Sequence, residues 1–363
     1  MTTRIATFAG EVARILNALR SLMQSYRLLG NLTAAEQILR IFVKTGSGLT
    51  PQGEAKEKLL QQIQTSLRMG MPIPMSLTIA HGLRAPNPLK YEDPFGPPTY
   101  AWLHSLFTFL LISERVKCVY QPGMQFFVFE EGHLFDELLE VPKGVVDRNL
   151  RMFQRLIDAT SAPVTSINLF KEHLPEAEAV KLPVEVLEAE VHAFVCSSPW
   201  MNDPEVLGDL YVRGDKPYEL IKERVGRARW EEMRQKALRK SQTLALRRHN
   251  GIFRHLVKKA TGMDVAGRMI DGAITSKEGR LSIKATGGAL FNHGMPVVDW
   301  RRNTCHIVPQ YRIGSDFTVG NRSFPLGKVL ISPAEFGEEG ATYMWCYESL
   351  DSVSGATPDS ESK

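Results

Sequence analysis

The sequence lacks the features that mark secreted, metal-knuckle and membrane-spanning proteins. Its four cysteines are far apart and have no CxxC or CxxH spacing, which argues against a zinc knuckle or a disulfide scaffold. The longest apolar run, 101–112, contains His104 and falls short of the roughly 20 residues that span a bilayer. The N-terminus carries Glu11 and no signal-peptide core. We therefore expect a soluble, cytoplasmic protein without membrane association.

Common catalytic motifs and a strong net charge are also missing. There is no GxGxxG, Walker loop, GxSxG or HExxH motif. The formal net charge is only +4, which does not by itself indicate a nucleic-acid partner. Residues 222–259 are an exception, with 13 Lys and Arg against three Glu. Leu238, Phe253 and Leu256 are spread through this stretch, so one of its faces is expected to pack in the core. We therefore favour the interpretation that its basic residues form a solvated face. A nucleic-acid-binding surface is the alternative from another functional class.

What the sequence does contain is typical of an α/β protein. Hydrophobic residues make up 43% and charged residues 23% of the 363 positions, enough for one large or two modest domains. Predicted strands alternate with helices, which favours the α/β class with a mixed, mostly parallel sheet flanked by helices. Residues 184–262 form a helix-rich middle region. Strands are predicted at 75–80, 125–130, 164–170, 280–285, 304–313, 328–332 and 341–347, with helices at 99–115 and 143–159.

The chain divides into three parts. Residues 1–30 are predicted to form a helix with one apolar stripe, which packs either on the body or on a second copy, as in a homodimer. Residues 31–350 form the catalytic domain, with a weak candidate lobe boundary at 196–204. Its first helix begins with the capping-box pair Thr33 and Glu36. Residues 351–363 are expected to be a disordered tail.

Two groups of cations and amides suit anionic ligands. Arg84, Asn87 and Lys90 follow the strand at 75–80, and Arg gives bidentate hydrogen bonds to carboxylate or phosphate. The alternative is a proline-fixed loop with solvated charges. Later, strand alternation places Arg280, Ser282 and Lys284 on one face as an anion cradle, or as the charges of a protected edge strand. Two further histidines, taken singly, are more typical of structural residues: His293 and His306.

Acids and an imidazole gather where the strand at 125–130 ends. Glu130, Glu131, His133 and Glu137 fall within eight residues. Crowded carboxylates raise one another's pKa, so such a group could transfer protons near neutral pH. The alternative is a glycine turn with exposed acids.

The order of these segments resembles the isonitrile (isocyanide) synthases, which include the pyoverdine/paerucumarin-type and dityrosine-type enzymes. Where the family has F-P-x-K-S-x-N-x-x-K, this chain has HGLRAPNPLK at 81–90. The family's Y-x-P-G, strand and S-D-G-x-x-F-x-D-x-x-x-V are matched by YQPGM and FFVFEEGHLFDELLEV at 120–141. Its R-L-S-I-H is matched by RLSIK at 280–284. The likeness spans about 33–310.

Several positions depart from the family pattern. Arg84 and Ala85 replace its lysine and serine, Glu130 and Glu131 replace S-D, and Lys284 replaces a histidine. The T-P-W-H box has no clean counterpart, and either FNHG at 291–294 or TCH at 304–306 stands in its place.

The resemblance implies a reaction without metal or cofactor. The family joins the α-amine of an amino acid, often aromatic, to ribulose 5-phosphate and converts the nitrogen into an isonitrile for specialised metabolism. An iron/2-oxoglutarate oxygenase often acts downstream as a partner. A related enzyme that gives an N-formyl or other one-carbon product is the second interpretation, and an inactive binding relative is another.

By motif position the roles are divided between anion binding and proton transfer. Asn87 would hold a polar substrate group. Glu131 and His133 would transfer protons, Glu137 would orient them, and either His293 or His306 would be a second acid. The cations that would bind the phosphate and the carboxylate are Arg84, Lys90, Arg280 and Lys284.

Overall fold

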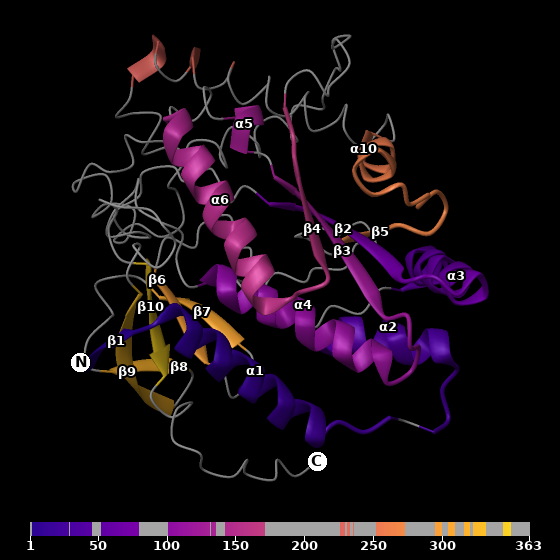
Figure 1. Cartoon of the computed structure of the whole chain (residues 1–363), viewed down its shortest axis with the longest axis horizontal. Coiled ribbons are helices and arrows are strands. Elements are labelled where there is room, and N and C mark those ends of the chain that lie inside the picture. Colours follow the sequence, from indigo (N-terminus) through magenta and orange to yellow (C-terminus); the bar gives the residue numbers. More distant parts are fainter. Residues whose placement is uncertain are drawn as a thin grey trace.

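The computed structural model describes two sheets and the helices that pack on them (Figure 1). The arrangement confirms the predicted α/β class. Among the described strand pairs, parallel pairing predominates, as predicted, but the strands form two sheets where one was expected. The described residues are 2–28, 30–45, 52–79, 101–130, 132–135, 142–170, 226–228, 231–232, 235, 252–272, 295–299, 304–308, 316–319, 322–331 and 344–349.

The first sheet is entirely parallel and has the strand order β4-β3-β2-β5. Helix α4 (Ala101–Lys117) connects β2 to β3, and α6 (Lys143–Thr160) connects β3 to β4. Both helices were predicted within two residues of their observed starts. The strands are β2 (Ile73–Ile79), β3 (Met124–Glu130), β4 (Val164–Asn168) and the short β5 (Ile270–Gly272), which the sequence analysis missed.

Strand β3 is buried on both faces because helices cover both. The Phe126 ring stacks on Phe109 of α4, with 4.7 Å between ring centroids. The Phe129 ring stacks on Phe253 of α10 (Ile252–Thr261) at 4.0 Å. Positions 126 and 129 point to opposite faces, since side chains alternate along a strand. A strand buried on both faces reads as a continuous apolar run, as QFFVFE does here.

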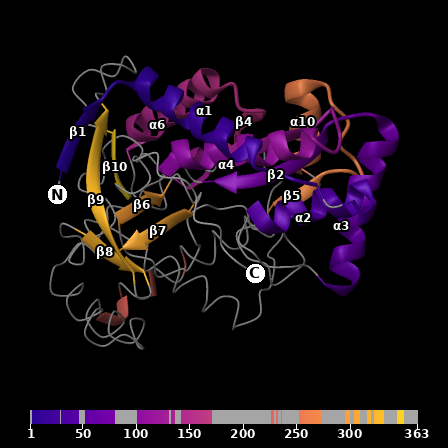
Figure 2. The ribbon, with the colours of Figure 1, turned by 90° about the horizontal axis from the view of Figure 1, so that it is seen from below.

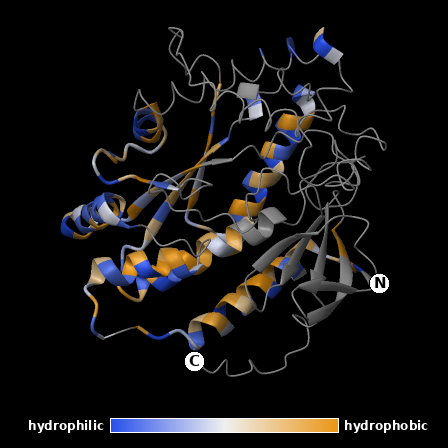
Figure 3. Ribbon diagram, turned by 180° about the vertical axis from the view of Figure 1, so that it is seen from behind, coloured by the Kyte–Doolittle hydropathy of each residue, from blue (hydrophilic) through white to orange (hydrophobic). Residues whose placement is uncertain are grey.

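Helix α4 is the central helix of the molecule. It contacts β3 of the parallel sheet and β6 of the second sheet. Residues 106–112 are buried, and α4 is hydrophobic over most of its surface, whereas α1 alternates hydrophobic and hydrophilic residues (Figure 3). The predicted buried helix is thus confirmed. Over the described ranges of the chain, no helix combines the length and the apolar character that crossing a bilayer would require.

Three N-terminal helices precede the parallel sheet in the chain; the first two contact α4, whereas the third contacts the second helix and β2. They are α1 (Phe8–Gln24), α2 (Ala34–Thr45) and α3 (Gly53–Met69). Helix α1 packs against α4 and α6 and buries Ile15, so the body of the same chain supplies its cover. At the start of α2, the backbone N–H of Thr33 donates to Glu36 at 2.9 Å, and the N–H of Glu36 donates back to the Thr33 hydroxyl at 3.3 Å. The predicted capping box is confirmed.

The second sheet is mixed and lies at the other end of the molecule from α3 (Figure 2). Its order is β1-β9-β10-β6-β7, with β8 paired to β9. Its strands include the predicted segments near 304, 328 and 344 and also three that were not predicted, β1 (Thr2–Ala6), β6 and β8. The bounds are β6 (Met295–Asp299), β7 (Thr304–Val308), β8 (Asp316–Val319), β9 (Arg322–Ile331) and β10 (Met344–Ser349).

The prediction of a helix at the start of the chain was wrong for residues 2–6. Thr2–Ala6 form strand β1, which pairs in parallel with residues 327–331 of β9. Helix α1 begins only after Thr7, whose side chain accepts a hydrogen bond from the Gly10 N–H at 3.1 Å. The five residues of this strand pair with a strand more than 300 positions away in the sequence. Helical periodicity describes spacing within one segment, so it cannot indicate such a pairing.

Candidate functional site

Three strands of the parallel sheet end side by side. Ile79 of β2 pairs with Glu130 of β3, which pairs with Asn168 of β4, and Leu77 of β2 pairs with Gly272 of β5. The strands after β2 in the sequence, β3 and β4, lie on one side of β2, whereas β5 lies on the other. Open α/β sheets bind ligands outside the carboxyl ends of their strands at such a reversal of strand order. We therefore take this edge as the candidate site.

The segments chosen from the sequence follow these strands in the chain. The loop with Arg84, Asn87 and Lys90 comes after β2, and the acidic segment comes after β3. The segment at 280–294 comes after β5. Because the three preceding strands are parallel, all three segments begin at the same edge of the sheet. Nine of the ten predicted site residues lie outside the described part of the chain: Arg84, Asn87, Lys90, Glu131, Glu137, Arg280, Ser282, Lys284 and His293.

Gly272 lets β5 lie closely against β2. A Cβ atom at this position would be 2.8 Å from Leu77 Cδ2 and 3.0 Å from the Ser76 carbonyl oxygen. The hydroxyl of Ser76, which is buried, donates to the Ile270 carbonyl at 3.3 Å. Because Gly272 has no side chain, β5 can lie close to β2. These are the two strands at which the strand order reverses.

Glu130 is the acid that the structure fixes at this edge. Its side chain is fully buried, so the interpretation as an exposed turn acid is wrong for Glu130. By alternation it lies on the same face as Phe126 and Val128, the face covered by α4. Its carbonyl accepts a hydrogen bond from the Leu169 N–H at 2.9 Å, which joins the ends of β3 and β4. The sequence shows that Glu130 ends the apolar run of β3, but it does not show that this side chain is buried.

Of the predicted site residues, His133 is the one that the structure places next to the end of β3. It lies on the short helix α5 (Gly132–Phe135), two residues after Glu131. Its Nε2 is 2.9 Å from Oδ1 of Asp147 on α6, and its ring stacks on Phe170 with 5.1 Å between centroids and 9° between planes. The imidazole side chain is 8% exposed, whereas that of Asp147 is 41% exposed. The imidazole ring is thus fixed by the contact of its Nε2 with Asp147 and by the stacking of one face on Phe170.

A carboxylate beside an imidazole fixes which ring nitrogen carries the proton and stabilises the charged ring. That arrangement suits a group that takes up and returns protons. The orienting role was predicted for Glu137, which lies outside the described residues, and not for Asp147. No local signal marked Asp147, since it is 14 positions away in an ordinary amphipathic helix.

Two other sequence candidates are placed by the structure. His306 lies on β7 in the mixed sheet, opposite Val297 of β6, and so belongs to a different sheet from Glu130. Of the basic stretch 222–259, α10 is described: its Leu256 and Val257 are buried, and Lys258 and Lys259 are exposed. Over this helix, the core face expected from the sequence is present. The described residues contain no group of three or more His, Cys, Asp or Glu that could hold a metal ion.

Comparisons with known proteins give a remote likeness among solved structures. No protein-family model matches the sequence, and no curated protein does. Among solved structures, the chain is similar to the PvcA protein from Pseudomonas aeruginosa, with 15% identity and a TM-score of 0.45. The match covers 87% of this chain and 99% of that protein. The candidate site is therefore defined by its own residues.

Proposed function

We propose that the chain is an isonitrile synthase-like enzyme of specialised metabolism. It would convert the α-amine of an amino acid, aromatic by preference, into an isonitrile with ribulose 5-phosphate as the carbon donor. The observation that supports this proposal best is the His133–Asp147 pair, three residues beyond the buried Glu130 at the end of β3. The family motif that this segment resembles carries acid groups at the same point in the chain.

The proposed reaction consists of proton transfers on a bound anion. The amine adds to the ketone of the sugar phosphate, and the resulting carbinolamine loses water to give an imine. Enolisation, loss of phosphate and cleavage of the two C–C bonds at the former ketone carbon follow, so that this carbon stays on the nitrogen and the other four leave as formaldehyde and a three-carbon hydroxycarbonyl fragment. Each step needs a group that removes a proton and returns one, and general acid–base catalysis is worth about 100- to 10,000-fold per step. His133, held by Asp147, would supply one such group, and Glu131 would supply another.

The substrates would be held by residues that follow the neighbouring strands. Arg84 and Lys90 after β2, and Arg280 and Lys284 after β5, would bind the phosphate and the carboxylate. Ser282 and Asn87 would bind uncharged polar groups. The pairing of β2 with β5 supports this proposal, because it starts the two segments from adjacent strands. Arg84→Ala would then mainly raise KM, and Glu131→Gln would mainly lower kcat.

A mass-spectrometric assay tests the reaction directly. Purified protein is incubated with ribulose 5-phosphate and each of the twenty amino acids in turn. The expected product carries one extra carbon on the amino nitrogen and shows the isonitrile stretch in the infrared. An N-formyl product would favour the second enzymatic interpretation, in agreement with the changed motif residues. Neither turnover nor binding of the sugar phosphate would refute the proposal.

The role of the His133–Asp147 pair has its own test. Asp147→Asn removes the negative charge but keeps the shape, so kcat should fall about 10- to 100-fold with little change in KM. Asp158→Asn, on an exposed position of the same helix, is the matched control and should behave as the wild type. Equal activity of both variants would remove the pair from the mechanism.

A further inference from the structure

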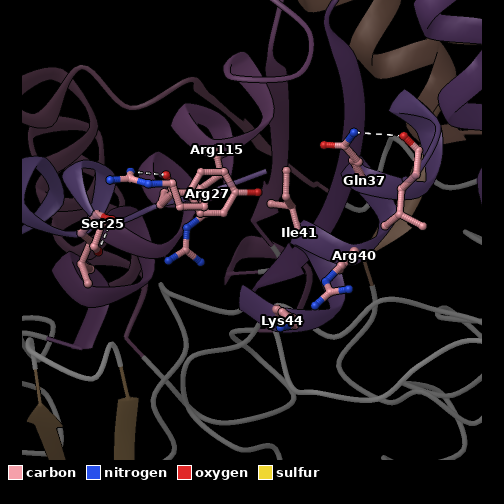
Figure 4. Close-up of a pocket in the computed structure, with 10 residues that line it drawn as sticks. Ser25, Arg27, Gln37, Arg40, Ile41, Lys44 and Arg115 are labelled. Carbon is pink, nitrogen blue, oxygen red and sulfur yellow. Dashed lines mark hydrogen bonds between the residues drawn. The ribbon is translucent and has the colours of Figure 1, made fainter. Parts of the chain in front are cut away.

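We propose that a cavity between α1, α2 and α4 binds a small organic anion. The cavity has a volume of about 330 Å³ (Figure 4). Four cationic side chains line it: Arg27 after α1, Arg40 and Lys44 on α2, and Arg115 on α4. The described residues that line it include no carboxylate, and none of the ion pairs in the described part of the chain involves these four cations. Unbalanced positive charge around a cavity calls for a negative ligand.

Two of the cations are held in place by the protein. Arg115 Nη1 donates to the Thr45 hydroxyl at 2.9 Å, and its guanidinium lies over the Tyr26 ring, 5.1 Å from the centroid. Arg27 Nη1 donates to the carbonyls of Gln24 and Tyr26, both at 2.9 Å. Side chains fixed before binding lose less conformational entropy when a ligand arrives. Partial burial lowers the pKa of Arg115, and an arginine keeps its charge nonetheless.

The other two cations repel each other in the absence of an anion. Arg40 and Lys44 are exposed and stand four positions apart on α2, so they lie on the same side of the helix. Like charges at this spacing destabilise a helix. A phosphate or carboxylate group between them would remove that repulsion and would also meet the guanidinium groups, which bind such groups bidentately.

The rest of the lining favours an organic ligand over a bare ion. Leu22, Leu32 and Ile41 contribute apolar surface, and Tyr26 contributes an aromatic ring. An inorganic anion would leave these side chains facing water, whereas the apolar part of an organic anion would cover them. The geometry thus points to a small molecule with one anionic group and one apolar or aromatic group.

This cavity is separate from the candidate catalytic site. Helix α4 starts beyond the carboxyl end of β2 and returns the chain to the start of β3. Arg115 lies near the C-terminal end of α4, so its cavity is near the opposite edge of the sheet from Glu130. Seventeen helical residues separate the two edges by about 25 Å. The proposal therefore stands independently of the proposed reaction.

Isothermal titration calorimetry of the full chain tests the proposal. The probes are phenyl phosphate, benzoate and inorganic phosphate. Phenyl phosphate should bind saturably with one site per chain, and more tightly than inorganic phosphate, and rising salt should weaken it. Benzoate tests whether a carboxylate serves in place of the phosphate, and tighter binding of benzoate would identify the anionic group as a carboxylate. No saturable binding of either organic probe would overturn the proposal, and equal affinity for inorganic and phenyl phosphate would overturn its organic part.

Charge-removing variants locate the binding. Arg40→Gln with Lys44→Gln changes two exposed residues and should weaken phenyl phosphate binding about tenfold or more, because charge-assisted hydrogen bonds are lost. Lys58→Gln with Arg68→Gln removes two exposed charges from α3, outside the cavity, and is the matched control. Circular dichroism checks that both variants fold. Equal weakening by the two double variants would show non-specific attraction and overturn the assignment.

Discussion

At the scale of single residues, three glutamates show how surroundings decide the role of one chemical group. Glu36 is half-buried and caps a helix. Glu11 is buried with its carboxylate against Arg4 and Arg14. Glu130 is buried at the end of a strand, at the edge where the strand order reverses. Of the three, Glu130 alone combines burial with a position at the candidate site.

The capping box at the start of α2 predicts a pH-dependent stability. Hydrogen bonds from Thr33 hold the pKa of Glu36 below its usual value. Because the folded-state pKa is lowered, this stabilisation is complete above the usual value of 4.5 and is lost as pH falls through the lowered pKa. Thr33→Ala should therefore lower the thermal midpoint at neutral pH and lose that effect in acid. Thr65→Ala, whose hydroxyl bonds a carbonyl, is the control and should show no such pH dependence.

At the scale of elements, burial on both faces explains the parallel sheet. Its central strand β3 is apolar from Phe126 to Phe129, because helices cover both of its faces. The polar side chain of Glu130 then comes at the carboxyl end of the strand.

We expect the close approach of β5 to β2 to require a glycine at position 272. Gly272→Ala would place a methyl group against Leu77 and the Ser76 carbonyl, so the free energy of unfolding should fall by about 1–3 kcal/mol. Urea unfolding measures the change. Gly144→Ala is the matched control, because a Cβ there meets nothing within 4 Å on helix α6, and it should be neutral or slightly stabilising. Equal stability of the two variants would contradict the close approach.

At the scale of the whole molecule, the N-terminus joins the mixed sheet to the helical layer. Strand β1 pairs with β9, and α1 packs against α4 and α6. Glu11 ties these two elements together: it accepts hydrogen bonds from Arg4 on β1 and, at 2.6 Å and 3.0 Å, from Arg14 on α1. The carboxylate is 2% exposed, so water screens these contacts little.

Neutralising Glu11 should therefore cost more than neutralising an exposed acid. Glu11→Gln should lower the free energy of unfolding by about 1.5–3 kcal/mol, the range for hydrogen bonds to a charged group. Glu114→Gln breaks the exposed pair with Lys117 on α4, and we expect a loss of at most about 1 kcal/mol. Chemical denaturation of both variants gives the comparison. A Glu11→Gln loss no larger than that of Glu114→Gln would show that the network does not couple the two parts.

Local patterns in the sequence determined much of this protein. Short apolar runs located β2, β3 and β4, and helical patterns located α2, α4 and α6, because each pattern reflects the side-chain spacing within one element. The capping box of Thr33 and Glu36 was found in the same way. His133 was chosen because an imidazole close to acids is itself a local pattern. The motif order also connected the candidate segments to the ends of predicted strands.

Only the tertiary structure decided what depends on distant pairings. It made Thr2–Ala6 a strand through β9, divided the strands into two sheets and placed β5 beside β2. It also buried Glu130, set Asp147 against His133 and brought the four cations together around one cavity. Such contacts form between residues far apart in the chain, and they depend on how helices and strands pack. Composition and residue spacing describe neighbours along the chain, so they cannot indicate these long-range contacts.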